Sequence, residues 1–397
     1  MFMQYAPPGA MLPLYSLHLH HLRFTPMQVA ACCATQAMAN VCASLLAGHI
    51  ADRWVSAERL LGACALLAGA DLWLLAGLRG WPAVFAATLV FWLLTGPILL
   101  LGSTICFSHL KQPERQFGPI RMWGTVGWMA AAWLVGFWFW LSHREALMHW
   151  GEAIHPDRPD GSIPGLFQVA GLLSFLLGTY SLTLPHTPPQ PALDRKPAPL
   201  AALQLLRGRA FFIYTICLFG VCVTYPFTTQ GTPLLLAKLG VSHTWMPPTL
   251  TLAQITEVIS LGLLPMLLLR LGVRGTMLVG LAAWTAALSS QAIGRPVELV
   301  AGSLCFNGLC IAGFFVAGQV FVNSRVHDGL RASVQALVTF VNGLGMLLGN
   351  LLMGWLRIWA GGELPQAFAV GALLMSCLLV IFVFGFQDSR VSKSVTA

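Results

Sequence analysis

Charged residues are scarce in this chain of 397 residues. They make up 9% of it, against roughly 25% in ordinary soluble domains, whereas hydrophobic residues make up 57% and the mean hydropathy is +0.74. The formal net charge of +8 comes from basic residues in short loops between apolar runs. Membrane orientation and lipid headgroups account for such loops better than nucleic acid does. The sequence therefore predicts a polytopic membrane protein that contacts lipids and does not bind nucleic acid.

Motifs for catalysis and metal binding are also missing. The ten cysteines lie in apolar runs and form no CxxC pair, which argues against a disulfide framework and a zinc ribbon. The chain contains neither GxSxG nor HExxH. His18, His20 and His21 stand close together, but a metal site there needs further ligands in fixed geometry. We expect no enzyme, no metal site and no cofactor.

Long apolar runs fill the chain instead. Runs of about 18 residues or more predict transmembrane helices, so the expected fold is all-α, with 12 transmembrane helices in two pseudo-symmetric bundles of six. The proline-rich stretch 185–208 is expected to be a cytoplasmic linker between bundles 1–184 and 209–397. Two such repeats describe a transporter. The spans are expected at 2–19, 27–48, 58–78, 82–108, 117–141, 164–184, 209–232, 245–270, 273–291, 296–323, 331–356 and 364–386.

The basic residues predict the orientation of these spans. Lysine and arginine are about twice as frequent in the loops of one side as in those of the other, which places both termini in the cytoplasm. No basic residue precedes Arg23, and no small-residue cleavage site follows the first apolar run. We therefore expect this run to remain as the first span rather than to be removed as a signal peptide.

One carboxylate interrupts the apolar run 245–269. Glu257 is roughly 18 Å from either end of that run at 1.5 Å per residue, and acids near the bilayer midplane are rare and usually functional. Gln254 precedes it by three residues and shares its helix face. A neutral carboxyl group crosses the membrane more easily than a carboxylate, which makes Glu257 a candidate proton site. The alternative is a structural acid paired with a nearby polar group.

The loop from Gly48 to Trp54 joins the second and third runs. Its sequence, GHIADRW, resembles the signature loop of the major facilitator superfamily. The resemblance implies that Gly48 lets helices approach, and that Asp52 and Arg53 form contacts that hold one conformation. Ion pairs at a helix end can form or break as two halves rock. The alternative is a solvated turn that carries positive-inside charge.

A more specific motif opens the fifth run. The sequence FGPIRMWGTVGW at 117–128, with TLPHTP at 183–188, QITE at 254–257 and RASVQ at 331–335, resembles the nucleoside:proton symporter family of that superfamily. The correspondence covers nearly the whole chain.

The family resemblance implies roles for individual residues. Arg121 and Thr125 are expected in the substrate cavity or in charge coupling, and Trp128 is expected to stack on the nucleobase. Gln254 and Glu257 are expected to bind substrate, with Glu257 also titrating. The alternatives are that Arg121 only snorkels to the interface and that Trp128 packs against lipid.

Four positions depart from the family pattern. The acid expected in the tenth span is replaced by Ala312, and the aromatic residue before it by Asn307. Tyr225 and Thr228 align with an amide pair in the seventh span, so we keep both, with Asn307, as candidate substrate-binding residues. Asp71 is an additional acid in the third span. It is either a second coupling site or a cap for polar groups of a neighbouring helix.

The predicted function is proton-coupled import of nucleosides or a related polar solute by alternating access. A monomer in the bacterial inner membrane, with protons as coupling ions, is expected. Two alternatives stay open. One is a sugar or aromatic-acid symporter of the same superfamily, and the other is a membrane sensor that uses this scaffold without transporting.

Overall fold

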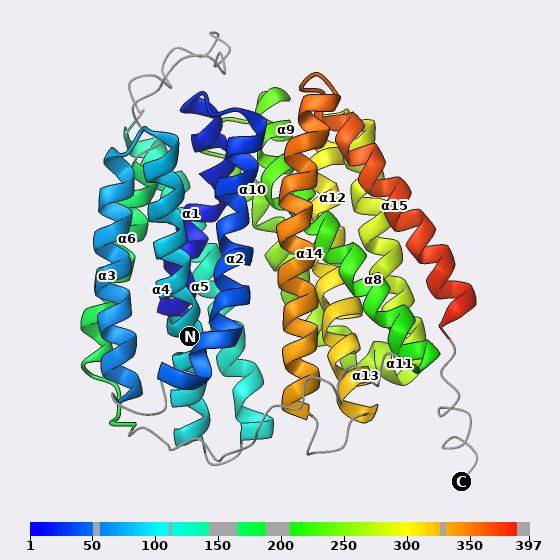
Figure 1. The fold of residues 1–397 in the computed structure, drawn as a ribbon, viewed down its shortest axis with the longest axis horizontal. Coiled ribbons are helices and arrows are strands. Elements are labelled where there is room, and N and C mark those ends of the chain that lie inside the picture. Colours follow the sequence, from blue (N-terminus) through cyan, green and yellow to red (C-terminus); the bar gives the residue numbers. More distant parts are fainter. Residues whose placement is uncertain (51–55, 111–112, 143–164, 188–206, 326–330, 387–397) are drawn as a thin grey trace. The chain divides into compact units, whose positions relative to one another are not determined.

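Helices form all of the regular secondary structure in the part of the chain that the structure describes (Figure 1). The structure is a computed structural model, and it describes residues 1–50, 56–110, 113–142, 165–187, 207–325 and 331–386. Helices are expected here because backbone groups in lipid must be satisfied within their own segment. The helix ends lie within a few residues of the predicted spans in most cases.

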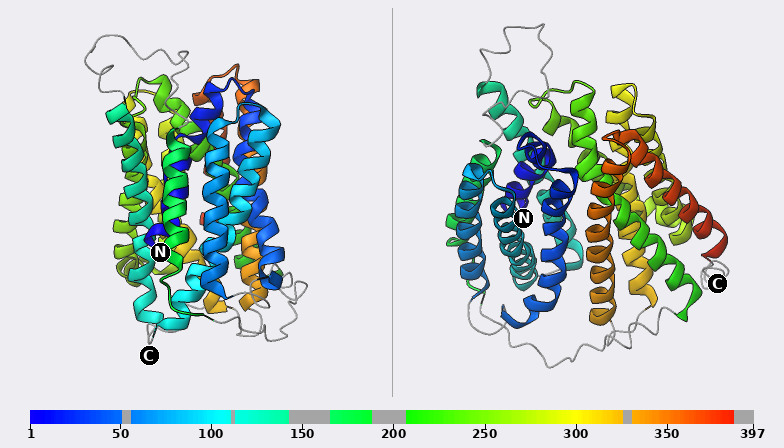
Figure 2. Two further views of the ribbon diagram at one scale, coloured as in Figure 1. Left: turned by 90° about the vertical axis from the view of Figure 1, so that its left-hand side faces the viewer. Right: turned by 45° about the horizontal axis from the view of Figure 1, so that its top comes forward.

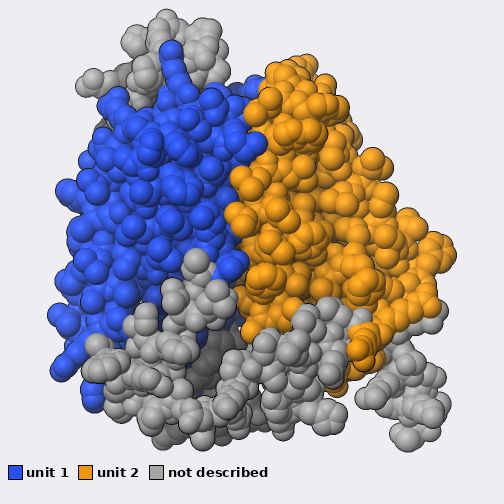
Figure 3. Space-filling model, viewed as in Figure 1, with its two compact units in different colours: residues 1–195, 229–251 blue, residues 196–228, 252–397 orange. Residues whose placement is uncertain are grey.

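The chain divides into two compact units (Figure 3). Unit 1 comprises Met1–Arg195 and Thr229–Thr251, and unit 2 comprises Lys196–Thr228 and Leu252–Ala397. The helices of unit 1 are α1 (Phe2–His21), α2 (Pro26–Ile50), α3 (Ala57–Gly77), α4 (Trp81–His109), α5 (Pro113–Ser142), α6 (Gly165–Ser181), α9 (Thr232–Lys238) and α10 (Met246–Leu250).

Unit 2 is built on α8 and the long helix α11. In this unit α11 packs on α12 and α15, and α8 packs on α14 and α15. Its helices are α8 (Arg209–Pro226), α11 (Leu252–Ile293), α12 (Val297–Cys310), the π-helix η4 (Ile311–Val316), α13 (Ala317–Arg325), α14 (Arg331–Trp359) and α15 (Leu364–Gly385). A second π-helix, η3 (Phe227–Gly231), follows α8.

Helix α11 contains the ninth predicted span and most of the eighth. The helix is interrupted at Gly272, whose φ of 66° and ψ of 176° are not helical. A positive φ suits glycine because it has no Cβ. Gly272 therefore makes the break between the eighth and ninth predicted spans, although no loop separates them.

Small residues bring α3 and α6 together in unit 1 (Figures 1 and 2). A Cβ on Gly171 would lie 3.1 Å from the carbonyl oxygen of Gly69, and the Ser174 hydroxyl donates to the carbonyl oxygen of Ala65 at 2.8 Å. Small residues are typical where membrane helices approach closely. This pairing places Asp71 of α3 in a helix that packs on α6 and α4.

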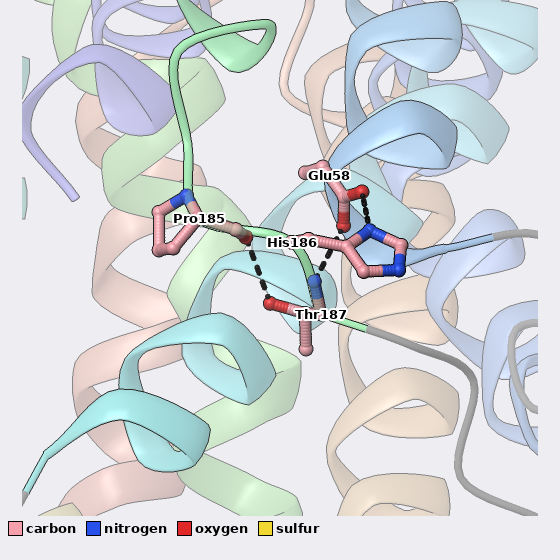
Figure 4. Close-up of polar contacts among 4 residues, drawn as sticks. All are labelled: Glu58, Pro185, His186 and Thr187. Atoms are coloured by element: carbon pink, nitrogen blue, oxygen red, sulfur yellow. Dashed lines mark hydrogen bonds and ion pairs between the residues drawn. The ribbon is translucent and has the colours of Figure 1, made fainter.

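Glu58 ties the start of α3 to the segment that leaves α6 (Figure 4). Its carboxylate contacts Nδ1 of His186 at 2.8 Å and accepts a hydrogen bond from the backbone N–H of Thr187 at 3.0 Å. The N–H of Ala57 donates to the Thr187 carbonyl oxygen at 3.1 Å. These bonds satisfy backbone groups at a helix start, where four N–H groups lack partners within the helix.

Eight of the described helices are long and apolar enough to cross a membrane. They include the kinked segment Met246–Ile293, which contains two predicted spans, and the apolar helix Gly165–Ser181 is shorter. Many large apolar side chains on these helices are exposed, among them Trp73 at 53% and Phe384 at 74%. Exposed apolar surface of this kind is expected of a protein that faces lipid.

Candidate functional site

The face of α5 that carries Arg121, Thr125 and Trp128 packs against α1. The three residues are spaced by four and three positions and therefore share one side of the helix. The guanidinium carbon of Arg121 lies 4.3 Å from the ring centroid of Tyr5 on α1, which is within the range of a cation–π contact. Thr125 is buried, whereas Arg121 and Trp128 are half-buried.

Glycines allow this close approach of α1 and α5. A Cβ on Gly9 would lie 2.7 Å from Cα and from the carbonyl oxygen of Trp128, and 3.0 Å from Cγ of its ring. A Cβ on Gly124 would lie 2.7 Å from the ring of Tyr5. The backbone of Trp128 is thus held against α1. The same packing keeps the Arg121 guanidinium group near the Tyr5 ring.

A second group of predicted residues lies in unit 2, on α8, α11 and α12. Gln254 and Glu257 are half-buried on α11. Gly308 of α12 has its Cα so close to this helix that a Cβ would collide with the backbone nitrogen of Glu257 and lie 2.5 Å from Oγ1 of Thr256. Helix α12 therefore crosses α11 at the level of Glu257.

Asn307 precedes this crossing point and is only 7% exposed. Its side-chain oxygen is buried and accepts no hydrogen bond within the described chain. Buried acceptors are normally paired, so the Asn307 oxygen is open to a donor that the described residues do not supply. The structure thus brings Asn307 and Glu257, which are 50 positions apart, into one neighbourhood.

Tyr225 is the member of this group of predicted residues that lies on α8. Its ring is parallel to that of Trp284 on α11, with centroids 5.9 Å apart and an interplanar angle of 8°. Thr228 follows in η3, is buried, and donates its hydroxyl to the Tyr225 carbonyl oxygen at 2.9 Å. Tyr225 is thus oriented by contacts on both its ring and its backbone.

The position of the missing acid lies inside a π-helix. Ala312 is fully buried in η4. The next residue, Gly313, packs against α11, and a Cβ added to it would lie 3.1 Å from the Cα of Gly280. π-Helical turns occur frequently at functional sites. The position at which the family resemblance implies an acid thus lies in an irregular turn and carries no carboxylate.

The remaining predicted residues are placed differently. Asp71 is half-buried on α3, and its Oδ2 is buried without a hydrogen-bond partner among the described residues. Asp71 shares no helix with the two groups described above. Gly48 lies near the end of α2. Asp52 and Arg53 lie outside the described residues, so their gating role stays a prediction.

Sequence reasoning missed two aromatic residues that hold the candidates in place. Tyr5 lies under Arg121, and Trp284 stacks on Tyr225. Both belong to ordinary apolar runs, where an aromatic residue is most often core packing. The sequence offers no sign of either pairing, because each partner is far away along the chain.

Comparison with known proteins identifies the family. The model of the family described as "Nucleoside H+ symporter" matches residues 1–390. The chain belongs to this family. It is accordingly a proton-coupled transporter of the nucleoside symporter type and not an enzyme, as the motif resemblance predicted.

Two curated relatives from Escherichia coli strain K12 match along nearly their whole length. The chain is 29% identical to xanthosine permease, over 99% of this chain and 96% of the relative. It is 25% identical to the nucleoside permease NupG, over 94% and 93% respectively.

Solved structures confirm the fold. The crystal structure of the nucleoside transporter NupG superposes with a TM-score of 0.81 at 23% identity, covering 98% of this chain and 97% of that one. The D-xylose-proton symporter superposes with a TM-score of 0.71 at 12% identity, covering 98% and 96%. The chain therefore has the predicted all-α major facilitator fold and is a multi-pass membrane protein.

Proposed function

We propose that this protein imports nucleosides together with protons, and that Glu257 is the group that takes up and releases the proton. The observation that carries the proposal is the position of Glu257. Glu257 is half-buried in an apolar helix, at the crossing of α11 with Gly308 of α12. An acid inside an apolar membrane helix is rare and usually functional, which makes Glu257 the candidate for carrying the proton.

The solute is proposed to bind to polar groups that surround this acid. Gln254 shares the helix face of Glu257, and Asn307 supplies a buried oxygen without a partner. Tyr225 of α8 and Thr228 of η3 are proposed as further solute contacts. Hydroxyl and amide groups of this kind suit the ribose and the base edge of a nucleoside, as the relatives named xanthosine permease and nucleoside permease suggest.

The group on α5 is proposed to supply the rest of the solute contacts. Trp128 offers an aromatic face for a nucleobase, and Thr125 and Arg121 offer hydrogen bonds. Arg121 also favours the second candidate function, an aromatic-acid symporter, because a guanidinium group binds a carboxylate with two parallel hydrogen bonds. Competition between a nucleoside and an aromatic acid of similar size separates the two candidates.

Transport is proposed to follow an alternating-access cycle in the bacterial inner membrane. Both termini lie in the cytoplasm, and the Gly48, Asp52 and Arg53 loop stabilises one conformation by ion pairing. The proposed transporter is a monomer that uses protons and no cofactor. Asp71, with its unpaired Oδ2, is proposed as an auxiliary proton site.

The test is uptake of labelled uridine into cells that lack their own nucleoside permeases. We expect uptake to be abolished by a protonophore and by Glu257→Gln. Glu298→Gln is the matched control, since this acid is exposed in the first turn of α12, and it should leave uptake unchanged. Uptake that persists with both the protonophore and Glu257→Gln would contradict proton coupling through this residue.

Counterflow in proteoliposomes separates a transporter from a sensor. Vesicles loaded with unlabelled uridine should accumulate labelled uridine through the unaltered protein. Exchange without a proton gradient does not require net proton release, so we expect Glu257→Gln to retain more counterflow than uptake. A sensor would bind uridine and exchange none.

A further inference from the structure

We propose that Tyr225 presents one face of its ring to the nucleobase and that Trp284 and Thr224 hold this ring in position. The inference rests on the proposed nucleoside transport and adds to it a base-stacking surface that neither the motifs nor the relatives' names assign. It makes Trp284 a positioning residue for solute binding. It also predicts how the transporter discriminates between solutes.

The geometry of the aromatic pair is the first observation. The rings of Tyr225 and Trp284 are nearly parallel, at 8°, with centroids 5.9 Å apart. This is an offset stack, an arrangement that aromatic rings prefer over direct face-to-face contact. Trp284 is fully buried, whereas Tyr225 keeps partial exposure. The accessible part of the stack therefore belongs to Tyr225.

Thr224 holds the Trp284 ring of this stack in place. The indole Nε1 of Trp284 donates to Oγ1 of Thr224 at 2.7 Å, and this hydroxyl donates in turn to the carbonyl oxygens of Gly220 at 3.0 Å and Val221 at 3.1 Å. Thr224 precedes Tyr225 directly in α8. The same turn of helix thus carries the stacking ring and the anchor of its partner, so the two rings move together.

The position of Tyr225 relates the stack to the solute. Tyr225 is one of the residues that the proposed function assigns to solute binding, and Thr228, whose hydroxyl donates to the Tyr225 carbonyl oxygen at 2.9 Å, is another. In the family pattern an amide pair is expected at this part of the seventh span. An aromatic ring there replaces hydrogen bonding to a base edge by contact with a base face.

This replacement has a consequence for selectivity. Every base has a π-face, so stacking tolerates changes at the base edge, whereas amide groups read that edge. We therefore expect purine and pyrimidine nucleosides to compete with one another, and purines to bind more tightly because of their larger ring. Free ribose, which has no ring to stack, should compete poorly.

The test measures the KM of labelled adenosine and uridine uptake in four variants. Tyr225→Leu removes the face and should raise the KM for adenosine about tenfold, with a smaller rise for uridine. Tyr225→Phe keeps the face and should change the KM for adenosine less than about threefold. Thr224→Val leaves the indole N–H without its acceptor and should raise the KM severalfold, whereas Thr224→Ser keeps the acceptor and should not.

A matched control comes from the same helix. Tyr214 is buried beside Phe314, with ring centroids 5.8 Å apart, and Tyr214→Phe should leave the KM unchanged. A purely structural role of Trp284 and Thr224 would reduce the amount of folded transporter and thus Vmax, with the KM unaltered. That result in Thr224→Val and Tyr225→Leu would overturn the stacking proposal.

The failure of this inference is distinguishable from failure of the proposed function. If the unaltered protein takes up nucleosides but Tyr225→Leu keeps its KM, or ribose competes as well as adenosine, only the stacking surface is refuted. If the unaltered protein takes up no nucleoside, the proposed function and the stacking surface are both refuted.

Discussion

Gly308 of α12 lies directly against the backbone nitrogen of Glu257 on α11. No side chain separates the two helices at the residue that we propose as the proton site. A methyl group at this position would overlap atoms of Thr256 and Glu257, so the contact requires glycine for space. The close crossing limits movement of the Glu257 backbone, and Asn307 directly precedes the glycine that makes the contact.

Gly308→Ala tests this contact. Overlap with backbone atoms forces the helices apart, and overpacking of this kind costs about 1–3 kcal/mol. Thermal unfolding of the purified protein should show the loss, and uridine uptake should fall. Gly302→Ala is the matched control on the same helix, because no atom lies within 4 Å of the Cβ it would add. Equal stability of the two variants would show that the helices separate without cost.

Tyr5→Leu tests the position of Arg121. The ring 4.3 Å from the guanidinium carbon is removed, and a cation–π contact of this kind contributes about 0.5–2 kcal/mol. We expect the KM for uridine to rise about twofold to tenfold, whereas Tyr5→Phe should keep the KM of the unaltered protein. Tyr180→Leu is the control, since that ring is 51% exposed on α6. A KM that rises equally in Tyr5→Phe would assign the effect to the hydroxyl instead.

Glu58 and His186 should contribute unequally to stability. The His186 side chain is 67% exposed and that of Glu58 is 9% exposed, and exposed ion pairs contribute at most about 1 kcal/mol. Glu58 also accepts the buried N–H of Thr187 (Figure 4), and a lost buried hydrogen bond costs about 1–3 kcal/mol. Glu58→Ala should therefore destabilise the protein more than His186→Ala in denaturant unfolding. Equal losses would mean that the Thr187 bond adds nothing.

Asp71→Asn tests the auxiliary proton site. Removing a buried carboxylate that has no partner for Oδ2 among the described residues should leave the free energy of unfolding unchanged or increase it by about 1 kcal/mol. Uridine accumulation driven by a pH gradient should fall but remain sensitive to a protonophore. If Asp71→Asn abolishes accumulation as completely as Glu257→Gln, Asp71 is a principal coupling residue and not an auxiliary one.

Much of the fold followed from local sequence. Transfer of a segment into the bilayer depends on the apolar character of about 20 consecutive residues, which is a property of that segment alone. The predicted runs therefore match helices such as α3 and α15 to within a residue or two. The same reasoning identified Glu257 as unusual, because an acid inside an apolar run is visible without any partner.

Only the tertiary structure decided which residues lie together. The stack of Trp284 on Tyr225, the contact of Arg121 with Tyr5, and the junction of Glu58 with His186 join positions that are far apart in the chain. The π-helix around Ala312 likewise lies inside a run that reads as continuous helix. Hydropathy describes whether each segment is apolar enough to lie in lipid. The pairing of helix faces depends instead on the shapes and polar groups of two segments at once, which no single stretch of sequence contains.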